Sequence, residues 1–242
     1  MTINWEVVVL GEDVAGRSDL RAEHGVAFYL KGPGRRVLFD TSQSAAALLH
    51  NAAALNIELV KTDTIVLSHG HFDHAGGLPG LLHHGLCPTL YTHPDAFTRR
   101  YSRRRDGTVT EMSMPTDFGD PNWVSLTKSI VYTRQATPIG PGLWATGEVP
   151  RRTNYENSGG NFFLDVLCNH RDPIRDNQAM YLYVDQGVVV LLGCAHAGVV
   201  NVLQQVRQLT GGRRIYGVIG GMHLGDASPQ RLRRTVQAFE AL

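Results

Sequence analysis

The chain has 242 residues, of which 43% are hydrophobic and 19% charged, and its formal net charge is +1 at pH 7. This is the composition of an ordinary globular protein, and its near-neutral charge gives no field that would collect nucleic acid or an anionic membrane. No apolar run approaches the roughly 20 residues that a bilayer requires, and the N-terminus lacks the features of a secretory signal. We therefore expect a single cytoplasmic domain over residues 1–242 with a small-molecule partner, no nucleic acid and no membrane, and a homodimer stays open.

The first third of the chain alternates extended and helical patterns. Residues 3–11, 25–32 and 35–41 are rich in β-branched and aromatic side chains and are bounded by glycine, which predicts three strands. Residues 42–57 (SQSAAALLHNAAALNI) start with serine and continue with a helical apolar repeat, so they predict a helix. Residues 63–68 (DTIVLS) predict a short buried strand.

The middle of the chain is less regular. Residues 98–126 are polar, contain arginine, methionine and proline, and show no sustained period, so they predict a loop or lid insertion. Whether this insertion covers the site or contacts a second copy stays open. Residues 129–135 and 142–149 predict two further strands, and a second irregular stretch follows over 151–175.

The last third is the most regular part. Residues 179–193 (AMYLYVDQGVVVLLG) predict two strands joined by a turn at Asp185–Gly187, and residues 213–221 predict another strand. Residues 197–212 and 228–242 predict amphipathic helices, the second with a Ser228–Pro229 start. Two successive sets of strands and helices, each leading to a histidine-bearing loop, predict two sheets with helices outside and a site along one edge.

Four potential metal ligands crowd the loop that follows the strand at 63–68: His69, His71, Asp73 and His74. His69 and His71 can turn to one side and share a cation, while Asp73 and His74 can reach a second one. Zinc suits these groups because imidazole nitrogen and carboxylate oxygen bind it at about 2.0–2.2 Å, and paired metals lie roughly 3.5–4 Å apart. The alternative is a polar loop that is merely rich in histidine.

The stretch HGHFDHAGGL at 69–78 resembles the His-x-His-x-Asp-His signature of the metallo-β-lactamase superfamily. AEHGVAFYL, VLFDTSQS, YTHPDAF, TGEVPR, DNQAMYLYVDQGVVVLLGCAHAGVVN and GVIGGMHL, in this order, resemble its branch named for 7,8-dihydropterin-6-methyl-4-(β-D-ribofuranosyl)aminobenzene 5′-phosphate synthase. The resemblance implies an α/β fold, an αββα sandwich of two mixed β-sheets with helices on the outer faces. It also implies one or two metals at the edge of the sheets, a dinuclear metal site in the second case, and hydrolysis by a metal-bound hydroxide.

The remaining ligands must come from elsewhere in the chain. His196 and His223 each follow an apolar strand and lie beside glycines, although a histidine satisfied within the core is the alternative for both. Cys194 stands where many relatives carry a bridging aspartate, and it is either a thiolate ligand or a buried free cysteine.

Two departures from the branch leave the second metal open. Many relatives carry a third histidine ligand on an earlier loop. The residues of this chain just before the strand at 179 contain His170, Asp172 and Asp176 instead of an obvious matching histidine. Branch members also continue past the last helix into a strand with a His-Cys-Thr-Gly segment, so the final ligand stays undetermined.

The expected function is a zinc-dependent hydrolase, with manganese or iron as alternative metals, acting on a small anionic and phosphorylated substrate. Asp73 would bind metal and take a proton from the attacking water, as the resemblance also implies. Arg151, Arg99 and Arg103 are the candidate substrate contacts, because a guanidinium suits phosphate, although basic runs are usually only solvated. A synthase-like reaction and a non-catalytic metal- or ligand-binding regulatory protein stay open.

Several other polar residues are expected to support the ligands rather than to bind metal, because a histidine ligand commonly needs a partner on its other ring nitrogen. These residues are Glu23, His24, Asp40, Thr41 and His93.

Overall fold

The computed structural model describes residues 4–115 and 123–241. These residues form two compact units. The described part of the first, here called the N-terminal unit, comprises residues 4–98, 113–115 and 123–132. The described part of the second, the C-terminal unit, comprises residues 99–112 and 133–241.

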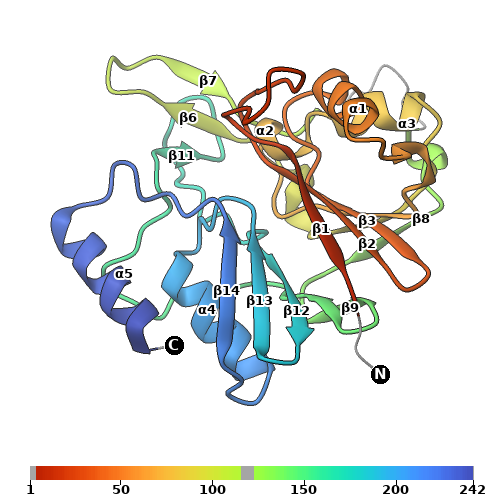
Figure 1. Ribbon diagram of the computed structural model, residues 1–242. Helices are drawn as coiled ribbons and strands as arrows, with labels where there is room; N and C mark the ends of the chain where they lie inside the picture. Colours follow the sequence, from red (N-terminus) through yellow and green to blue (C-terminus); the bar gives the residue numbers. More distant parts are fainter. Residues whose placement is uncertain (1–3, 116–122, 242) are drawn as a thin grey trace. The chain divides into compact units, whose positions relative to one another are not determined.

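The N-terminal unit contains a six-stranded mixed sheet in the order β1-β2-β3-β4-β5-β8 (Figure 1). Its strands are β1 (Glu6–Gly11), β2 (Ala27–Gly32), β3 (Arg35–Phe39), β4 (Thr64–Val66), β5 (Thr89–Thr92) and β8 (Ser129–Tyr132). The first three strands are antiparallel neighbours, whereas β3, β4, β5 and β8 run parallel. The parallel strands therefore all end at one edge of the sheet, and β4 leads there into the histidine loop.

Helices cover one face of this sheet (Figure 1). They are α1 (Ala45–Ala54), α2 (Phe72–Ala75) and α3 (Leu78–His83), with the short 3-10 turns η1 (Leu59–Lys61), η2 (Pro94–Phe97) and η3 (Trp123–Leu126). Leu48 of α1 and Leu81 of α3 pack with Leu38 and Ile65 of the sheet in one buried core. The sequence places α1 correctly because Ser44 caps its first turn and apolar residues recur on the buried side.

The C-terminal unit contains two sheets. The larger is mixed and five-stranded, in the order β14-β13-β12-β10-β9, and the smaller is an antiparallel sheet in the order β11-β6-β7. Their strands are β6 (Tyr101–Arg103), β7 (Val109–Glu111), β9 (Thr137–Gly140), β10 (Leu143–Ala145), β11 (Phe162–Phe163), β12 (Ala179–Val184), β13 (Gly187–Leu192) and β14 (Ile215–Gly220). Because β13 and β14 are parallel neighbours, the loops that follow them start from the same edge.

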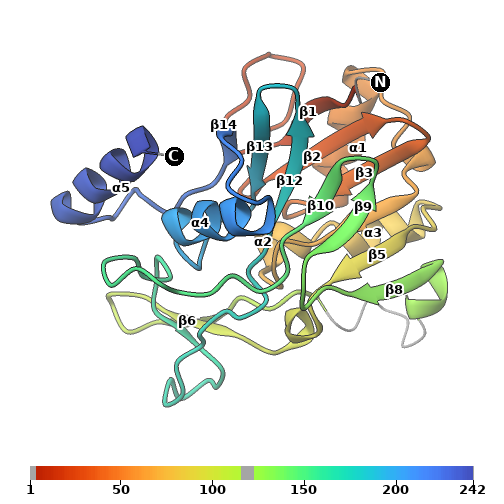
Figure 2. The same cartoon turned by 90° about the horizontal axis from the view of Figure 1, so that it is seen from below.

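Helix α4 (Val199–Leu209) packs on the larger sheet and α5 (Pro229–Ala241) completes the unit (Figure 2). Val199 and Leu203 of α4 share a buried core with Val188 and Val190 of β13. Among the described residues, no helix is long and apolar enough to cross a membrane. The predicted turn between β12 and β13 is confirmed, with Val184 paired to Gly187.

The irregular stretches contain more structure than the sequence predicts. The region at 98–126, predicted as a loop or lid insertion, contains the β6–β7 hairpin and η3, and its residues 116–122 lie outside the described part of the chain. Strands β9 and β11 also lie outside the predicted strands. All four of these strands have four residues or fewer, which is too short for an alternation of polar and apolar residues to be recognised.

A buried ion-pair cluster holds the start of the β6–β7 hairpin. Arg100 is 1% exposed, donates from Nη2 to Asp176 Oδ1 at 2.8 Å, and places Nε 3.3 Å from Asp172 Oδ2. Basic runs such as the one around residues 99–105 are usually solvated, whereas Arg100 of this run is buried. Two carboxylates offset the cost of burying the guanidinium, so the cluster tethers the hairpin to the segment before β12.

Replacing Asp176 by asparagine should therefore destabilise the protein, because Arg100 would keep its buried charge and lose one of its two carboxylates. We expect the free energy of unfolding in a urea titration to fall by roughly 3 kcal/mol. The matched control is Asp19→Asn, which removes a carboxylate from the exposed Arg17–Asp19 pair and should leave the urea midpoint unchanged. Equal midpoints for the two variants would contradict this account.

Candidate metal centre

The loop that leaves β4 carries the four predicted ligands in buried positions. β4 ends at Val66 and α2 begins at Phe72, and residues 68–74 are called the histidine loop below. Its possible ligands are no more than 6% exposed: His69, His71, Asp73 and His74. Buried ionisable groups need hydrogen-bond partners or a cation, so this crowding is not that of an ordinary polar surface loop.

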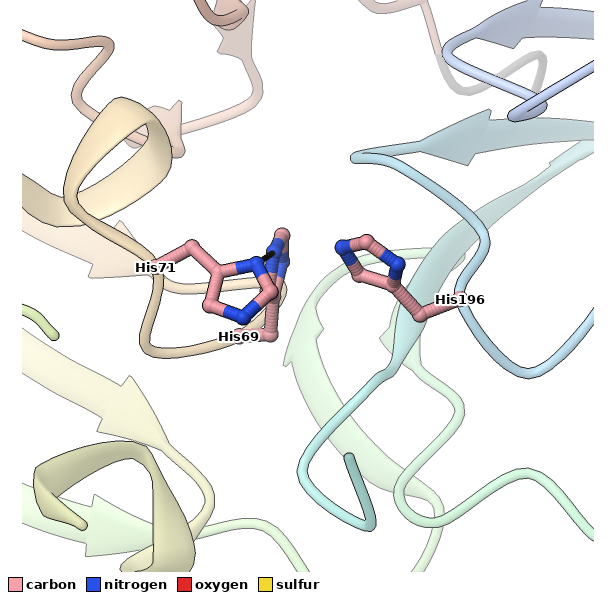
Figure 3. Close-up of side chains that lie close together, drawn as sticks. All are labelled: His69, His71 and His196. Atoms are coloured by element: carbon pink, nitrogen blue, oxygen red, sulfur yellow. Dashed lines mark hydrogen bonds between the residues drawn. The ribbon is translucent and has the colours of Figure 1, made fainter. Parts of the chain in front are cut away.

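The histidine loop follows a tight path that turns His69 and His71 toward each other (Figure 3). A Cβ on Gly70 would lie 1.9 Å from the carbonyl oxygen of Ala96, so only glycine fits between the two histidines. His69 Nε2 lies 2.9 Å from His71 Nδ1. Two nitrogens bound tetrahedrally to one cation at about 2.0–2.1 Å would be separated by about 3.3 Å, so a small rotation of either ring would fit this pair to a shared metal.

Asp40 fixes the proton positions of two of these histidines. Asp40 Oδ2 lies 2.7 Å from both Ser68 Oγ and His74 Nδ1, so the Ser68 hydroxyl and the His74 Nδ1–H donate to it. Because the only hydroxyl proton of Ser68 is used, Ser68 Oγ accepts from His69 Nδ1, which lies 2.9 Å away. The Nε2 atoms of His69 and His74 are therefore left without a proton, as a metal requires.

Backbone contacts hold this arrangement in place. Asp40 has a φ of 61°, an uncommon value for a residue other than glycine, and its Oδ1 accepts from Ser68 N at 2.6 Å. Thr41 donates from its backbone N–H to His74 O at 2.7 Å. Asp40 and Thr41 thus make direct contacts with the histidine loop, whereas Glu23 accepts hydrogen bonds from Ser44 instead.

Asp73 is an ionised, buried carboxylate. Burial by itself would raise the pKa of Asp73, but the neighbouring His74 and His71 outweigh burial and hold this pKa well below its ordinary value. Asp73 Oδ2 lies 3.4 Å from His74 Nε2 and 3.5 Å from His24 Nε2. Its Oδ1 is buried without a hydrogen-bond partner among the residues described, which fits an oxygen that binds a cation.

The C-terminal unit carries a second group of possible ligands, Cys194, His196 and His223, called the Cys-His group below. One ligand atom from each residue lies within 4.8 Å of the others. Cys194 and His196 follow β13, and His223 follows its parallel neighbour β14. Gly221 N donates to Gly193 O at 2.8 Å, which holds the two strand exits together.

His196 is also held in a form that could bind metal. It is 1% exposed, and its Nδ1 lies 2.7 Å from the carbonyl oxygen of Ser158. Since a carbonyl can only accept, Nδ1 carries the proton and the lone pair of this ring lies on Nε2. The His196 ring lies 4.5 Å from the ring of His223, with Phe162 edge-on at 5.2 Å.

The donor chemistry of both groups fits a divalent metal. Imidazole nitrogens with a carboxylate suit zinc, iron or manganese, and the thiol of Cys194 would favour zinc among these. None of the three cysteines takes part in a disulfide, so the thiol of Cys194 is not consumed by one. The buried Asp73 oxygen and the proton positions at His69, His74 and His196 are the observations that carry this fit.

The three arginines predicted to bind substrate are exposed and have other contacts. Arg151 donates to Pro173 O at 2.8 Å, and Arg103 lies over the ring of Phe163 at 5.2 Å. Arg99 is exposed as well. Their roles in substrate binding stay predictions.

The remaining alternative ligands also have structural contacts. His93 is buried and its Nδ1 accepts from Asp95 N at 3.1 Å, which caps η2. His170 is exposed and pairs with Asp165 at 3.1 Å. Asp172 and Asp176 hold Arg100, so neither is a free carboxylate for a metal.

Sequence reasoning missed Ser68, although it directly precedes His69 and relays the effect of Asp40. A hydroxyl between a buried strand and a ligand could have been identified as a supporting group. It also missed Arg231, which resembles an ordinary surface charge in the helical run RLRRTVQ but is only 3% exposed. No signal in the sequence distinguishes Arg231 from its neighbours Arg233 and Arg234.

Comparison with known proteins identifies the family of the chain. The family model described as the metallo-beta-lactamase superfamily matches residues 20–147, which include the whole histidine loop. The chain therefore belongs to the metallo-β-lactamase superfamily, and it has the α/β fold of mixed sheets and helices of that superfamily.

Particular relatives are similar over most of the chain. A Methanocaldococcus jannaschii protein named 7,8-dihydropterin-6-methyl-4-(beta-D-ribofuranosyl)-aminobenzene-5'-phosphate synthase is 30% identical over 250 residues, covering 99% of this chain and 84% of the relative. An uncharacterised protein of the same organism is 29% identical over 221 residues, covering 91% of this chain and 80% of the relative. A crystal structure described as a metal-dependent hydrolase of the beta-lactamase superfamily has a TM-score of 0.78 and 29% identity, covering 98% of this chain and 84% of that one.

Replacing Asp40 by asparagine should weaken metal binding without moving the backbone, because asparagine tolerates the positive φ of this position. The amide has one acceptor oxygen where the carboxylate has two, so it cannot accept from Ser68 N on one side and from Ser68 Oγ and His74 Nδ1 on the other. We expect zinc affinity, measured by competition with a chromophoric chelator, to fall about 10- to 100-fold. The control is Asp185→Asn in the exposed turn between β12 and β13, which should bind zinc as the unaltered protein does. Equal affinities for the two variants would contradict the assigned role of Asp40.

Proposed function

We propose that this protein is a metal-dependent hydrolase that acts on a small anionic, phosphorylated substrate. The observation that carries the proposal is the buried, ionised Asp73, whose Oδ1 has no hydrogen-bond partner in the described part of the chain, within a loop of three histidines. Membership of the metallo-β-lactamase superfamily supports it. The relative described as a metal-dependent hydrolase supports the reaction type.

In this proposal, the histidine loop and the Cys-His group each offer ligands for a divalent cation, with zinc as the expected metal. A bound divalent cation lowers the pKa of water from 15.7 to about 7 and polarises a phosphoryl oxygen. The protein then needs no serine or cysteine nucleophile. Its own contribution is to keep the ligand nitrogens unprotonated, through Asp40 and Ser68 at one group and through the Ser158 carbonyl at the other.

Asp73 has a second role in this proposal, which is to orient the attacking water. The carboxylate stays ionised at neutral pH, because its pKa is held below the ordinary value. It can therefore accept a hydrogen bond from water and direct the oxygen lone pair toward the substrate. His24 faces Asp73 Oδ2 from a more exposed position and would connect this carboxylate to solvent.

A second candidate function is a synthase reaction on a phosphorylated substrate, with the phosphate retained in the product. It is favoured by the 30% identity to the relative named as a synthase that makes a ribofuranosylaminobenzene phosphate derivative of a dihydropterin. The two candidates differ in what leaves the substrate. Hydrolysis of a phosphate monoester releases an alcohol and inorganic phosphate. A condensation instead joins two substrates with loss of a small leaving group, keeps the phosphate and forms a larger product detectable by mass spectrometry.

Purified protein should contain one to two equivalents of zinc, manganese or iron by elemental analysis. Dialysis against a chelator should remove the metal and abolish turnover, and zinc should restore both. Protein that is free of metal after growth in a metal-rich medium would contradict the proposal. Metal with no turnover of any phosphate ester would instead favour the synthase reaction or the non-catalytic binding protein.

Replacing Asp73 by asparagine should lower turnover of a generic phosphodiester by about 100-fold or more, because the variant loses an acceptor for the attacking water and a ligand charge. Circular dichroism should show an unchanged fold. The Asp185→Asn variant, altered in an exposed turn, should retain full turnover. Retained turnover in the Asp73 variant would place the chemistry elsewhere.

A further inference from the structure

Helix α5 buries an arginine and exposes its apolar side chains. Arg231 is 3% exposed, whereas Leu232, Val236 and Phe239 of the same helix are 38% to 58% exposed. Nη1 of Arg231 donates to Asn157 Oδ1 at 2.7 Å. Its Nε and Nη2 have no hydrogen-bond partner within the described residues. A buried guanidinium is normally paired with a carboxylate, and within the described residues Nε and Nη2 of this one are buried without such a partner.

Arg231 borders an open cavity of about 710 Å³ that lies within the C-terminal unit. Other residues that line this cavity are Arg105, Asn157, Gly159, His223 and Asp226. Two guanidinium groups therefore face one carboxylate, and the cavity has an excess of positive charge. It is large enough for a phosphorylated small molecule, because ligand pockets are commonly about 300–1,000 Å³.

The cavity and the Cys-His group share residues. His223 belongs to both, and Gly159, with a φ of 78°, packs so closely on it that a Cβ would lie 2.5 Å from the His223 ring. The short segment at residues 157–161 links them further. Asn157 accepts from Arg231, and the carbonyl of Ser158 accepts from His196. An anion bound to Arg231 would thus lie beside possible metal ligands rather than on a remote surface.

We propose that this cavity binds the phosphate monoester group of the substrate, with Arg231 as its main anchor. The planar guanidinium fork can present Nε and Nη2 to two phosphate oxygens at once, and Asn157 fixes the fork by accepting from Nη1. Arg105 adds a second positive charge from the exposed side of the cavity. This inference rests on the proposed function, because the phosphate that it places in the cavity belongs to the substrate proposed there.

The proposal differs from a purely structural role of Arg231 in attaching α5 to Asn157. If Arg231 served only to attach α5, phosphate binding would not change when the other charges of the cavity are removed or neutralised. A phosphate site would instead weaken when Arg105 is removed and tighten when Asp226 is neutralised. These two residues are exposed, so their substitution tests the site without disturbing the buried contact.

The test measures binding of inorganic phosphate by titration calorimetry, using the full chain after removal of metal with a chelator. We expect saturable binding that is weakened roughly tenfold by Arg105→Ala and by Arg231→Lys, which keeps the charge but loses the fork. Asp226→Asn should tighten binding about threefold. Arg233→Ala, at an exposed position of the same helix, should bind phosphate as the unaltered protein does.

The proposal would be overturned if phosphate showed no saturable binding. It would also be overturned if the Arg105 and Asp226 variants bound phosphate with the affinity of the unaltered protein, or if binding required added metal. Because Arg231→Lys could destabilise α5, the thermal unfolding of this variant is measured too. If the variant is unfolded, the Arg105 and Asp226 variants alone test the proposal. Calorimetry on metal-free protein does not depend on turnover. A failed phosphate site is therefore distinguishable from a failed hydrolase, which would show in metal content and turnover.

Discussion

The buried carboxylate of Asp40 is the constraint on which the histidine loop depends. It accepts hydrogen bonds from Ser68 and from His74, and through Ser68 it also sets the protonation of His69. A single acceptor thus sets which ring nitrogen carries the proton in two histidines and fixes the loop to the end of β3. The positive φ of Asp40 shows that the backbone adopts an uncommon conformation to place this carboxylate.

Each unit builds its group of ligands in the same way. Parallel strands end at a common edge, and a loop of small residues then lets the side chains turn back toward that edge. In the N-terminal unit, Gly70 allows the loop to pass against Ala96, and in the C-terminal unit Gly221 allows β14 to end against Gly193. In both units a hydrogen bond to one ring nitrogen leaves the other available, with Asp40 serving His74 and the Ser158 carbonyl serving His196.

The regular elements were predictable because each has a local cause. Ser44 caps α1, and the alternation and turn of residues 179–193 give β12 and β13. The β6–β7 hairpin was not predictable, since three-residue strands are too short for a pattern and their stability comes from partners distant in sequence. Arg100 illustrates this, because its pairing with Asp172 and Asp176 spans more than 70 residues.

The sequence by itself determined the superfamily and the seven possible metal ligands, because ligand chemistry requires particular residue types at strand ends. The three-dimensional structure decided which of the other polar residues surround them. It turned Asp172 and Asp176 toward Arg100, gave Ser68 its position between Asp40 and His69, and buried Arg231 beside His223. An arginine on a helix has the same local pattern whether it is solvated or buried, so only the packing of distant segments could distinguish Arg231 from Arg233.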